Sequence, residues 1–118
     1  MHRYREVKRK FKRTSEHTTW QSPRSSVCRF LDLLGRRWMI AIVWAAAEEG
    51  AVRFNEFKMA LEGIPPRTLA QRLGELEDAG VLERRVLDAR PPRVEYRLTE
   101  AGRKLRVLVE AMRVYASA

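Results

Sequence analysis

The chain has 118 residues, of which 24 are Lys or Arg and 15 are Asp or Glu, so its formal net charge is +9. This length fits one domain with a single core and excludes a two-domain enzyme. The chain contains no run of about 18 uncharged apolar residues, which excludes a transmembrane helix. Its single cysteine excludes an intrachain disulfide and indicates a cytoplasmic protein.

Residues 1–24 are expected to be a basic, flexible arm, and residues 25–118 to be the folded domain. The arm holds eight Lys or Arg and two Glu, a net charge of +6. A segment of this kind is typical of contact with nucleic acid or of a solubilising tail. Tyr4, Val7 and Phe11 recur at helical spacing among the basic residues. That spacing also fits a short helix lying on an acidic surface, including a membrane.

Two apolar helices are predicted at the start of the folded domain. Gly35 is expected to end the first of them as a C′ glycine. The run Trp38–Ala47, WMIAIVWAAA, predicts a second helix that is buried on all sides, in a core or in an interface, and ends at Gly50. The first helix is recognised by an apolar stripe at helical spacing: Val27, Phe30, Leu31 and Leu34.

A short helix is predicted next, with Asn55 as its N-cap. Phe54 and Met59 can form the hydrophobic staple beside that cap. Phe57 and Leu61 give this helix its inner face.

The next helix is predicted from Pro66 to Ala79, directly after the break Ile64-Pro65-Pro66. Pro66 suits the first helical position, where a missing N–H costs nothing. Gly80 ends this helix. Its buried stripe is Leu69, Leu73 and Leu76.

A hairpin and a last helix complete the predicted domain. Two extended runs, Val81–Asp88 and Val94–Thr99, are joined by a tip at residues 89–93. Thr99 is expected to cap a helix that runs to about Tyr115. The stripe of this helix has coiled-coil spacing, so another helix should pack along it: Ala101, Leu105, Leu108, Met112 and Tyr115.

This order of elements predicts a mainly α fold with a small β-hairpin, a winged helix-turn-helix. A helix fits the major groove of DNA, where Arg can contact guanine and Gln can contact adenine. The alternative to DNA contact is that the polar side chains of the helix from Pro66 merely form a solvated face. At the hairpin tip, Arg90 and Arg93 flank two prolines, and arginine suits a narrow minor groove. The polar face of the helix from Pro66 comprises Arg67, Thr68, Gln71, Arg72 and Glu75.

Residues 27–105 resemble the winged-helix regulators of the HxlR type, relatives of the MarR regulators. Four blocks carry the resemblance: LDLLGRRW (31–38), RFNEF (53–57), IPPRTLAQRLGELEDAGVLERRV (64–86) and PPRVEYRLTEAGRKL (91–105). The resemblance implies a homodimeric prokaryotic DNA-binding regulator. It also implies that the helix from Pro66 enters the major groove and that extra N- and C-terminal helices form the dimer.

Two sets of site residues are expected from this combined reading of the chain. The residues expected to contact DNA are Asn55, Arg36 and Arg37, together with Arg67, Thr68, Gln71, Arg72, Arg90 and Arg93. The residues expected in the dimer interface are Phe30, Leu31, Trp38, Leu105, Leu108, Met112 and Tyr115.

Two positions depart from the family pattern. Many members have a cysteine where this chain has Ser25, and some use it to sense oxidants or electrophiles. The only thiol here is Cys28, so redox sensing cannot be carried over. Cys28 fits a small helix residue, while a Cys28–Cys28 link across a dimer stays open. Pro65 stands where the family often has a Ser- or Thr-like cap. We hypothesise that a DNA phosphate binds the uncapped amides near Arg67 and Thr68.

The leading function is a sequence-specific transcriptional regulator that acts as a homodimer on double-stranded DNA, without enzymatic activity. The alternative is an architectural protein that coats DNA with little sequence preference, and a third reading is an adaptor that binds a protein or a membrane through the arm. No cofactor or metal site is expected, because His2 and His17 have no partner at metal-ligand spacing. Neither the operator nor any small-molecule effector follows from the sequence.

Overall fold

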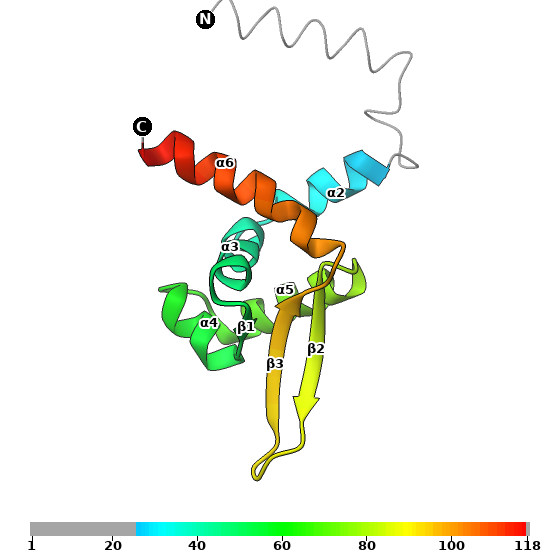
Figure 1. Ribbon diagram of the computed structural model, residues 1–118, viewed down its shortest axis with the longest axis vertical. Helices are drawn as coiled ribbons and strands as arrows, with labels where there is room; N and C mark the ends of the chain where they lie inside the picture. The colour runs from blue at the N-terminus through cyan, green and yellow to red at the C-terminus, as the bar shows by residue number, and fades with distance from the viewer. Residues whose placement is uncertain (1–25, 118) are drawn as a thin grey trace, which may run out of the picture. The chain divides into compact units, whose positions relative to one another are not determined.

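The structure is a computed structural model that describes residues 26–117. The chain divides into two compact units, residues 1–36 and residues 37–118. In the first unit the described element is α2 (Ser26–Leu34), and the other elements belong to the second unit (Figure 1). The predicted arm, residues 1–24, lies outside the described residues.

The second unit is a winged helix-turn-helix, as predicted. Its three strands form an antiparallel sheet in the order β1-β3-β2. The ribbon of β2 and β3 projects beyond the helices as the wing (Figure 1). In chain order the elements are α3 (Met39–Glu49), β1 (Ala51–Val52), α4 (Phe54–Ala60), α5 (Pro66–Asp78), β2 (Leu82–Leu87), β3 (Arg93–Leu98), the 3₁₀ helix η1 (Gly102–Leu105) and α6 (Arg106–Ser117).

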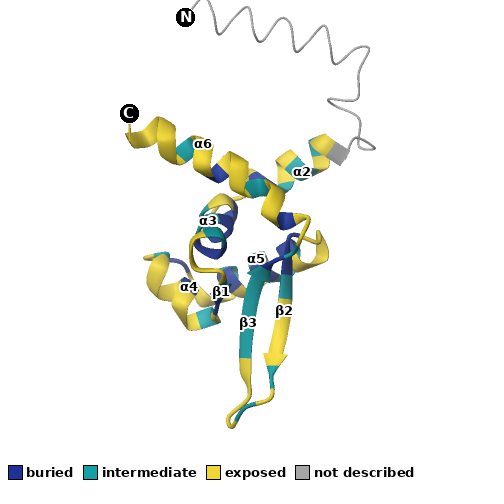
Figure 2. Cartoon of the chain, in the orientation of Figure 1, coloured by how far each residue is buried: buried dark blue, intermediate teal, exposed yellow. Residues whose placement is uncertain are grey.

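The core of this unit lies where α3, α4 and α5 meet the base of the sheet (Figure 2). The predicted stripe of α5 is confirmed, since Leu69, Leu73 and Leu76 are each at most 1% exposed. Phe57 of α4 is fully buried and meets the ring of Tyr96 edge-on, with ring centroids 6.3 Å apart. Burying each such side chain contributes about 1.5–3 kcal/mol, so this stripe fixes α5 firmly on the sheet.

The first predicted helix ends where the sequence indicates, but by another geometry. The Gly35 N–H donates to the Leu31 carbonyl at 2.8 Å, and Gly35 does not adopt the positive φ of a C′ glycine. The left-handed residue is Trp38 instead, with φ of 78°, immediately before α3. The expectation that Gly35 ends this helix as a C′ glycine was therefore wrong in its backbone geometry.

The second predicted helix is confirmed as α3, and Gly50 ends it with a φ of 83°. Within this chain α3 is not buried on all sides. Ile40 is 37% exposed and Trp44 is half-buried, whereas Met39 and Ile42 are fully buried. One flank of α3 therefore faces outward.

The start of α4 corrects two predictions. The N-cap is Arg53, and Asn55 lies within the first turn. The backbone N–H of Arg53 donates to the Glu56 carboxylate at 2.8 Å, which is the acidic half of a capping box. Met59 is 85% exposed, so the predicted staple with Phe54 does not form.

Thr99 and Gly102 fix the start of the C-terminal helix. Thr99 accepts a bond from the Gly102 N–H at 2.9 Å and donates to the Gly80 carbonyl at 2.5 Å, so its hydroxyl holds the turn that leads into this helix. The N-cap is Ala101, two residues after the predicted cap, and the helix begins as η1 rather than as α-helix. A Cβ on Gly102 would lie 2.2 Å from the Val81 carbonyl oxygen, so only glycine allows this close approach.

The inward face of α6 differs from the predicted stripe. Val109 is its buried residue, with 4% exposure, and Leu105 and Met112 are half-buried beside it. The predicted members Ala101, Leu108 and Tyr115 are exposed. The stripe that packs within the chain is therefore Leu105, Val109 and Met112.

Candidate nucleic-acid interface

The turn between α4 and α5 is held by backbone hydrogen bonds and one buried side chain. The Leu61 N–H donates to Phe57 at 2.8 Å, and the Ile64 N–H donates to Leu61 at 3.1 Å. Ile64 is 5% exposed and anchors the turn in the core. Pro66 occupies the first position of α5, as predicted. These contacts fix the start of α5 relative to α4, as a helix-turn-helix requires.

The outward face of α5 is polar, with little bulk at its centre. Arg67, Ala70 and Gln71 are exposed along it, and Gly74 follows one turn later. Apart from its chain neighbours and the nearby backbone of α5, no heavy atom of the described residues lies within 4 Å of the place where a Cβ on Gly74 would stand. The central part of this face is therefore free for another body to approach closely.

The N-terminus of α5 has no side-chain cap, in agreement with the sequence reading of Pro65. Thr68 is half-buried in the first turn, beside the exposed Arg67. The positive end of the helix dipole and a cation thus lie together at this end of α5.

Arg72 is placed differently from Gln71. Its Nε donates to the Arg37 carbonyl at 3.2 Å, and one terminal nitrogen pairs with the Glu75 carboxylate. The side chain is 18% exposed. In this conformation Arg72 ties α5 to the segment before α3 and does not project from the outward face.

The wing carries the two predicted arginines and one that sequence reasoning missed. Arg90 and Arg93 are exposed at its tip, as Figure 2 shows by the yellow end of the hairpin. Arg84 of β2 is exposed and pairs in register with Tyr96. Directly paired residues on neighbouring strands lie on the same face of a sheet, so Arg84 shares the face of Tyr96. The ring of Tyr96 on this face contacts Phe57 of α4. Arg84 stands two residues from both Leu82 and Val86, and this strand period could have indicated from the sequence that it shares their face.

These arginines are available to a ligand. Within residues 26–117, the guanidinium groups of Arg67, Arg84, Arg90 and Arg93 make no ion pair or hydrogen bond. An exposed guanidinium without a carboxylate partner suits a phosphate, which it can bind through two parallel hydrogen bonds.

The remaining DNA-contact predictions fall at the edges of this surface or outside it. Asn55 is exposed in the first turn of α4. Arg37 is exposed, with its guanidinium 5.0 Å from the centroid of the Trp38 ring. Arg36 is exposed in the first unit, so the structure does not place it against α5.

Most predicted dimer residues expose apolar surface. Leu31 of α2 is 44% exposed and Leu108 of α6 is 43% exposed. The other exposed member is Tyr115, and the half-buried members are Phe30, Trp38, Leu105 and Met112. Cys28 is half-buried on α2 and forms no disulfide.

Other kinds of site find no support in the described part of the chain. Residues 26–117 contain no group of three or more His, Cys, Asp or Glu side chains placed to hold a metal ion. None of the helices described is long and apolar enough to cross a membrane.

A helix-turn-helix with an arginine-bearing wing and an open polar helix face is the architecture of a winged-helix transcription regulator. The family description "HxlR-like helix-turn-helix" matches residues 33–118. The chain therefore belongs to the HxlR-like helix-turn-helix family.

Individual relatives agree with this assignment. The chain is 41% identical over 75 residues to the uncharacterised HTH-type transcriptional regulator YvaP of Bacillus subtilis, covering 64% of this chain and 68% of that one. The redox regulator HypR in its reduced form is similar in structure, with a TM-score of 0.68 and 39% identity over 79% of this chain and 91% of that chain. Reduced YodB of B. subtilis gives a TM-score of 0.66 and 33% identity, covering 78% and 90%.

Proposed function

We propose that the chain is a sequence-specific regulator that binds double-stranded DNA in the cytoplasm as a homodimer and acts by binding rather than by catalysis. In this proposal α5 enters the major groove, where Gln71 and Arg67 contact base edges. The wing follows the backbone or the adjacent minor groove through Arg90, Arg93 and Arg84. The open face of α5, beside unpaired arginines, is the observation that carries the proposal.

The proposed division between residues that contact bases and residues that contact phosphates follows from where each side chain lies. Gln71 is exposed on the outward face and can bond the edge of adenine through both ends of its amide. Arg90 and Arg93 stand on the wing, where contacts are mostly to phosphates and carry no sequence information. Arg72 supports this arrangement by fixing α5, because its guanidinium is already engaged.

The homodimer is supported by an apolar surface that residues 26–117 leave exposed. Val107, Leu108, Val114 and Tyr115 are each more than 40% exposed on α6. Between α6 and α3 lies an open groove of about 1170 Å³, with mainly apolar lining. Groups of exposed apolar side chains of this kind mark interfaces. A second copy would place two α5 helices on successive turns of one DNA face.

The test compares Gln71→Ala and Arg90→Ala on two duplexes. The preferred site is first obtained by selecting bound fragments from the source genome. Titrations at one fixed salt concentration then use that site and a scrambled duplex. Gln71→Ala should cost about 1–3 kcal/mol on the preferred site and little on the scrambled one. Arg90→Ala should weaken both more evenly.

The test has one control and one outcome that contradicts the proposal. Thermal melting of each variant checks that the fold is kept, which the exposure of both side chains leads us to expect. An equal loss for Gln71→Ala on both duplexes would remove α5 as the reading element. That result would favour the alternative function, an architectural protein that coats DNA.

A further inference from the structure

A second arginine cluster lies away from the wing tip, where the sheet runs into the C-terminal helix. A pocket of about 340 Å³ opens there in the second unit. It is polar, in contrast to the apolar grooves along α3 and α6. Its lining comes from the junction of α3 and β1, from β3, from η1 and from the start of α6: Gly50 and Ala51, Arg97 and Leu98, Arg103, and Arg106.

The charges of this pocket are unbalanced. Three of its six lining residues are arginines, and none is acidic. The nearest ion pair joins Arg97 Nε to Glu83 Oε1 at 4.0 Å, the outer limit for such a contact. Within residues 26–117, Arg103 and Arg106 have no ion pair or hydrogen-bond partner for their guanidinium groups. Three like charges with one distant carboxylate partner among them favour the binding of an anion.

The position of the arginines on the helix adds to this imbalance. Neither η1 nor α6 has an acidic residue in its first turn, where a carboxylate would complement the helix dipole. Arg103 and Arg106 stand there instead. The backbone amides are already used, because Thr99 accepts the Gly102 and Arg103 N–H groups at 2.9 Å each. The guanidinium groups, not the amides, are the donors left for a ligand.

We propose that this pocket binds a small metabolite through its phosphate or carboxylate group, held by Arg97, Arg103 and Arg106. Planar guanidinium groups bind such oxyanions through paired, charge-assisted hydrogen bonds. The pocket joins β3, which leads to the wing, to the start of α6, which carries the exposed apolar stripe. A ligand here contacts both functional elements and is placed to regulate the DNA-binding form of the protein.

The binding test uses the full-length protein without DNA, so it does not depend on the proposed DNA-binding function. Sodium pyrophosphate and sodium citrate serve as separate phosphate and carboxylate probes, titrated by calorimetry against NaCl of equal ionic strength. At least one probe should bind saturably and raise the melting temperature beyond the NaCl reference. Arg103→Ala and Arg106→Ala should each weaken that binding roughly tenfold.

Lys104→Ala is the matched control, because it removes one charge from the same turn but lies outside the pocket. It should leave the affinity of the probe within about twofold, as a screened surface charge does. An equal loss in Lys104→Ala would show only general charge attraction and would overturn the proposal. So would the absence of saturable binding by both probes.

The same variants show whether the arginines bind a metabolite or the phosphates of DNA. In buffer without either probe, the Arg103→Ala and Arg106→Ala variants should retain wild-type affinity for the duplex, whereas Arg90→Ala should lose it. If the pocket variants lose DNA affinity while probe binding is unchanged, the arginines serve the DNA backbone and the metabolite site is refuted.

Discussion

Helices α5 and α6 have similar lengths, 13 and 12 residues, but they use their apolar side chains in opposite ways. Helix α5 buries all of its large apolar residues within the chain, each at most 1% exposed. Helix α6 buries Val109 and leaves a second apolar stripe exposed. Figure 2 shows that most of α6 is exposed. The exposed fractions in that second stripe are 76% for Val107, 43% for Leu108, 59% for Val114 and 85% for Tyr115.

This difference indicates that α5 and α6 present surfaces suited to different partners. Because the stripe of α5 is satisfied within the chain, the opposite face of α5 is left for a hydrated, charged partner. Helix α6 exposes apolar side chains to water, which is unfavourable and agrees with the proposed contact to a second protein chain. One helix therefore fits DNA binding and the other fits assembly, and substitutions on the two should affect different measurements.

The largest effect is expected at the α5 stripe. Leu73→Ala removes a side chain that is 1% exposed and leaves a cavity in the core. We expect it to lower the free energy of unfolding by about 2–5 kcal/mol. Urea denaturation followed by circular dichroism measures this loss.

The same substitution on α6 provides the comparison for Leu73→Ala. Leu108→Ala should lower the urea midpoint only at protein concentrations where dimers form, because its contacts lie in the proposed interface. The loss caused by Leu73→Ala should instead be present in dilute samples too. If both losses are independent of concentration, the distinction between the two helices fails.

A charge on the exposed stripe of α6 should separate the proposed dimer. Leu108→Glu would bury a carboxylate without a partner, which costs about 3 kcal/mol and raises the dimer dissociation constant about 100-fold. Sedimentation equilibrium at micromolar concentration measures the change. Ser117→Glu adds the same charge at the end of α6 and should leave the dissociation constant nearly unchanged. A wild-type sample that sediments only at 13.8 kDa would contradict the dimer itself.

The contrast between the helices also explains what could be predicted from the sequence. On α5 one stripe of leucines stands among polar residues, so helical spacing alone identifies the buried face. On α6, Leu108 and Val109 are adjacent and both apolar. The spacing allows either to face inward, and only the position of α3 decides for Val109. A helix with two apolar stripes does not reveal which one packs within its own chain.

The candidate DNA interface shows the same limit for polar residues. Helix α5 and the two strands of the wing were predicted within about one residue, because proline and glycine mark their ends. The orientation of Arg72 was not, since its carbonyl partner on Arg37 is 35 positions away in sequence. Asn55 failed as an N-cap because the Arg53 amide bonds to Glu56, which fixes the helix start two residues earlier.

Gly74 offers a smaller test of the α5 surface. Gly74→Ala should raise the free energy of unfolding by about 0.5–1 kcal/mol, because alanine loses less backbone entropy in a helix and no protein atom obstructs its methyl group. If DNA approaches this face closely, the same methyl group should cost about 1 kcal/mol or more of binding free energy. Chemical denaturation and DNA titration measure the two effects.

Ala70→Gly is the reverse control on the same face of α5. It should destabilise the fold by about the same amount without adding bulk, and leave DNA affinity close to that of the wild type. A Gly74→Ala variant that is more stable and binds DNA normally would show that the centre of this face does not contact DNA.

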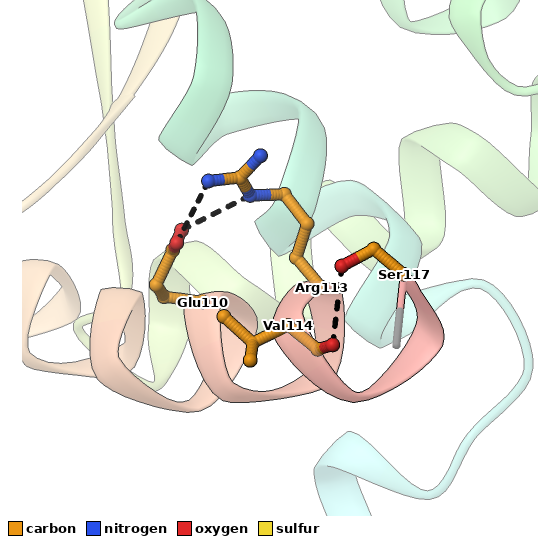
Figure 3. A network of polar contacts seen from close by, with 4 residues as sticks. All are labelled: Glu110, Arg113, Val114 and Ser117. Carbon is orange, nitrogen blue, oxygen red and sulfur yellow. Dashed lines mark hydrogen bonds and ion pairs between the residues drawn. The ribbon is translucent and has the colours of Figure 1, made fainter.

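Two Arg–Glu pairs extend the comparison to electrostatics. Each joins side chains three residues apart on one helix, Arg72 with Glu75 on α5 and Arg113 with Glu110 on α6. The pair on α5 is 18% and 19% exposed, whereas both side chains of the pair on α6 are 57% exposed. In the exposed pair, Arg113 donates to Glu110 at 2.7 Å (Figure 3). Solvent screens that contact far more effectively.

The smallest effect is therefore expected at Glu110. The hydrogen bond from Arg113 holds the pKa of the Glu110 carboxyl below its usual value. Because the pKa is lower in the folded state, the pair stabilises the fold above the ordinary carboxyl pKa, and this contribution is lost as the pH falls through the folded value. Arg113→Ala should raise the pKa of Glu110 in an NMR titration while barely changing the urea midpoint at neutral pH. Glu75→Gln should lower that midpoint clearly, because Arg72 is largely buried and also tied to Arg37. Equal midpoint changes in the two variants would show that burial does not distinguish the helices electrostatically.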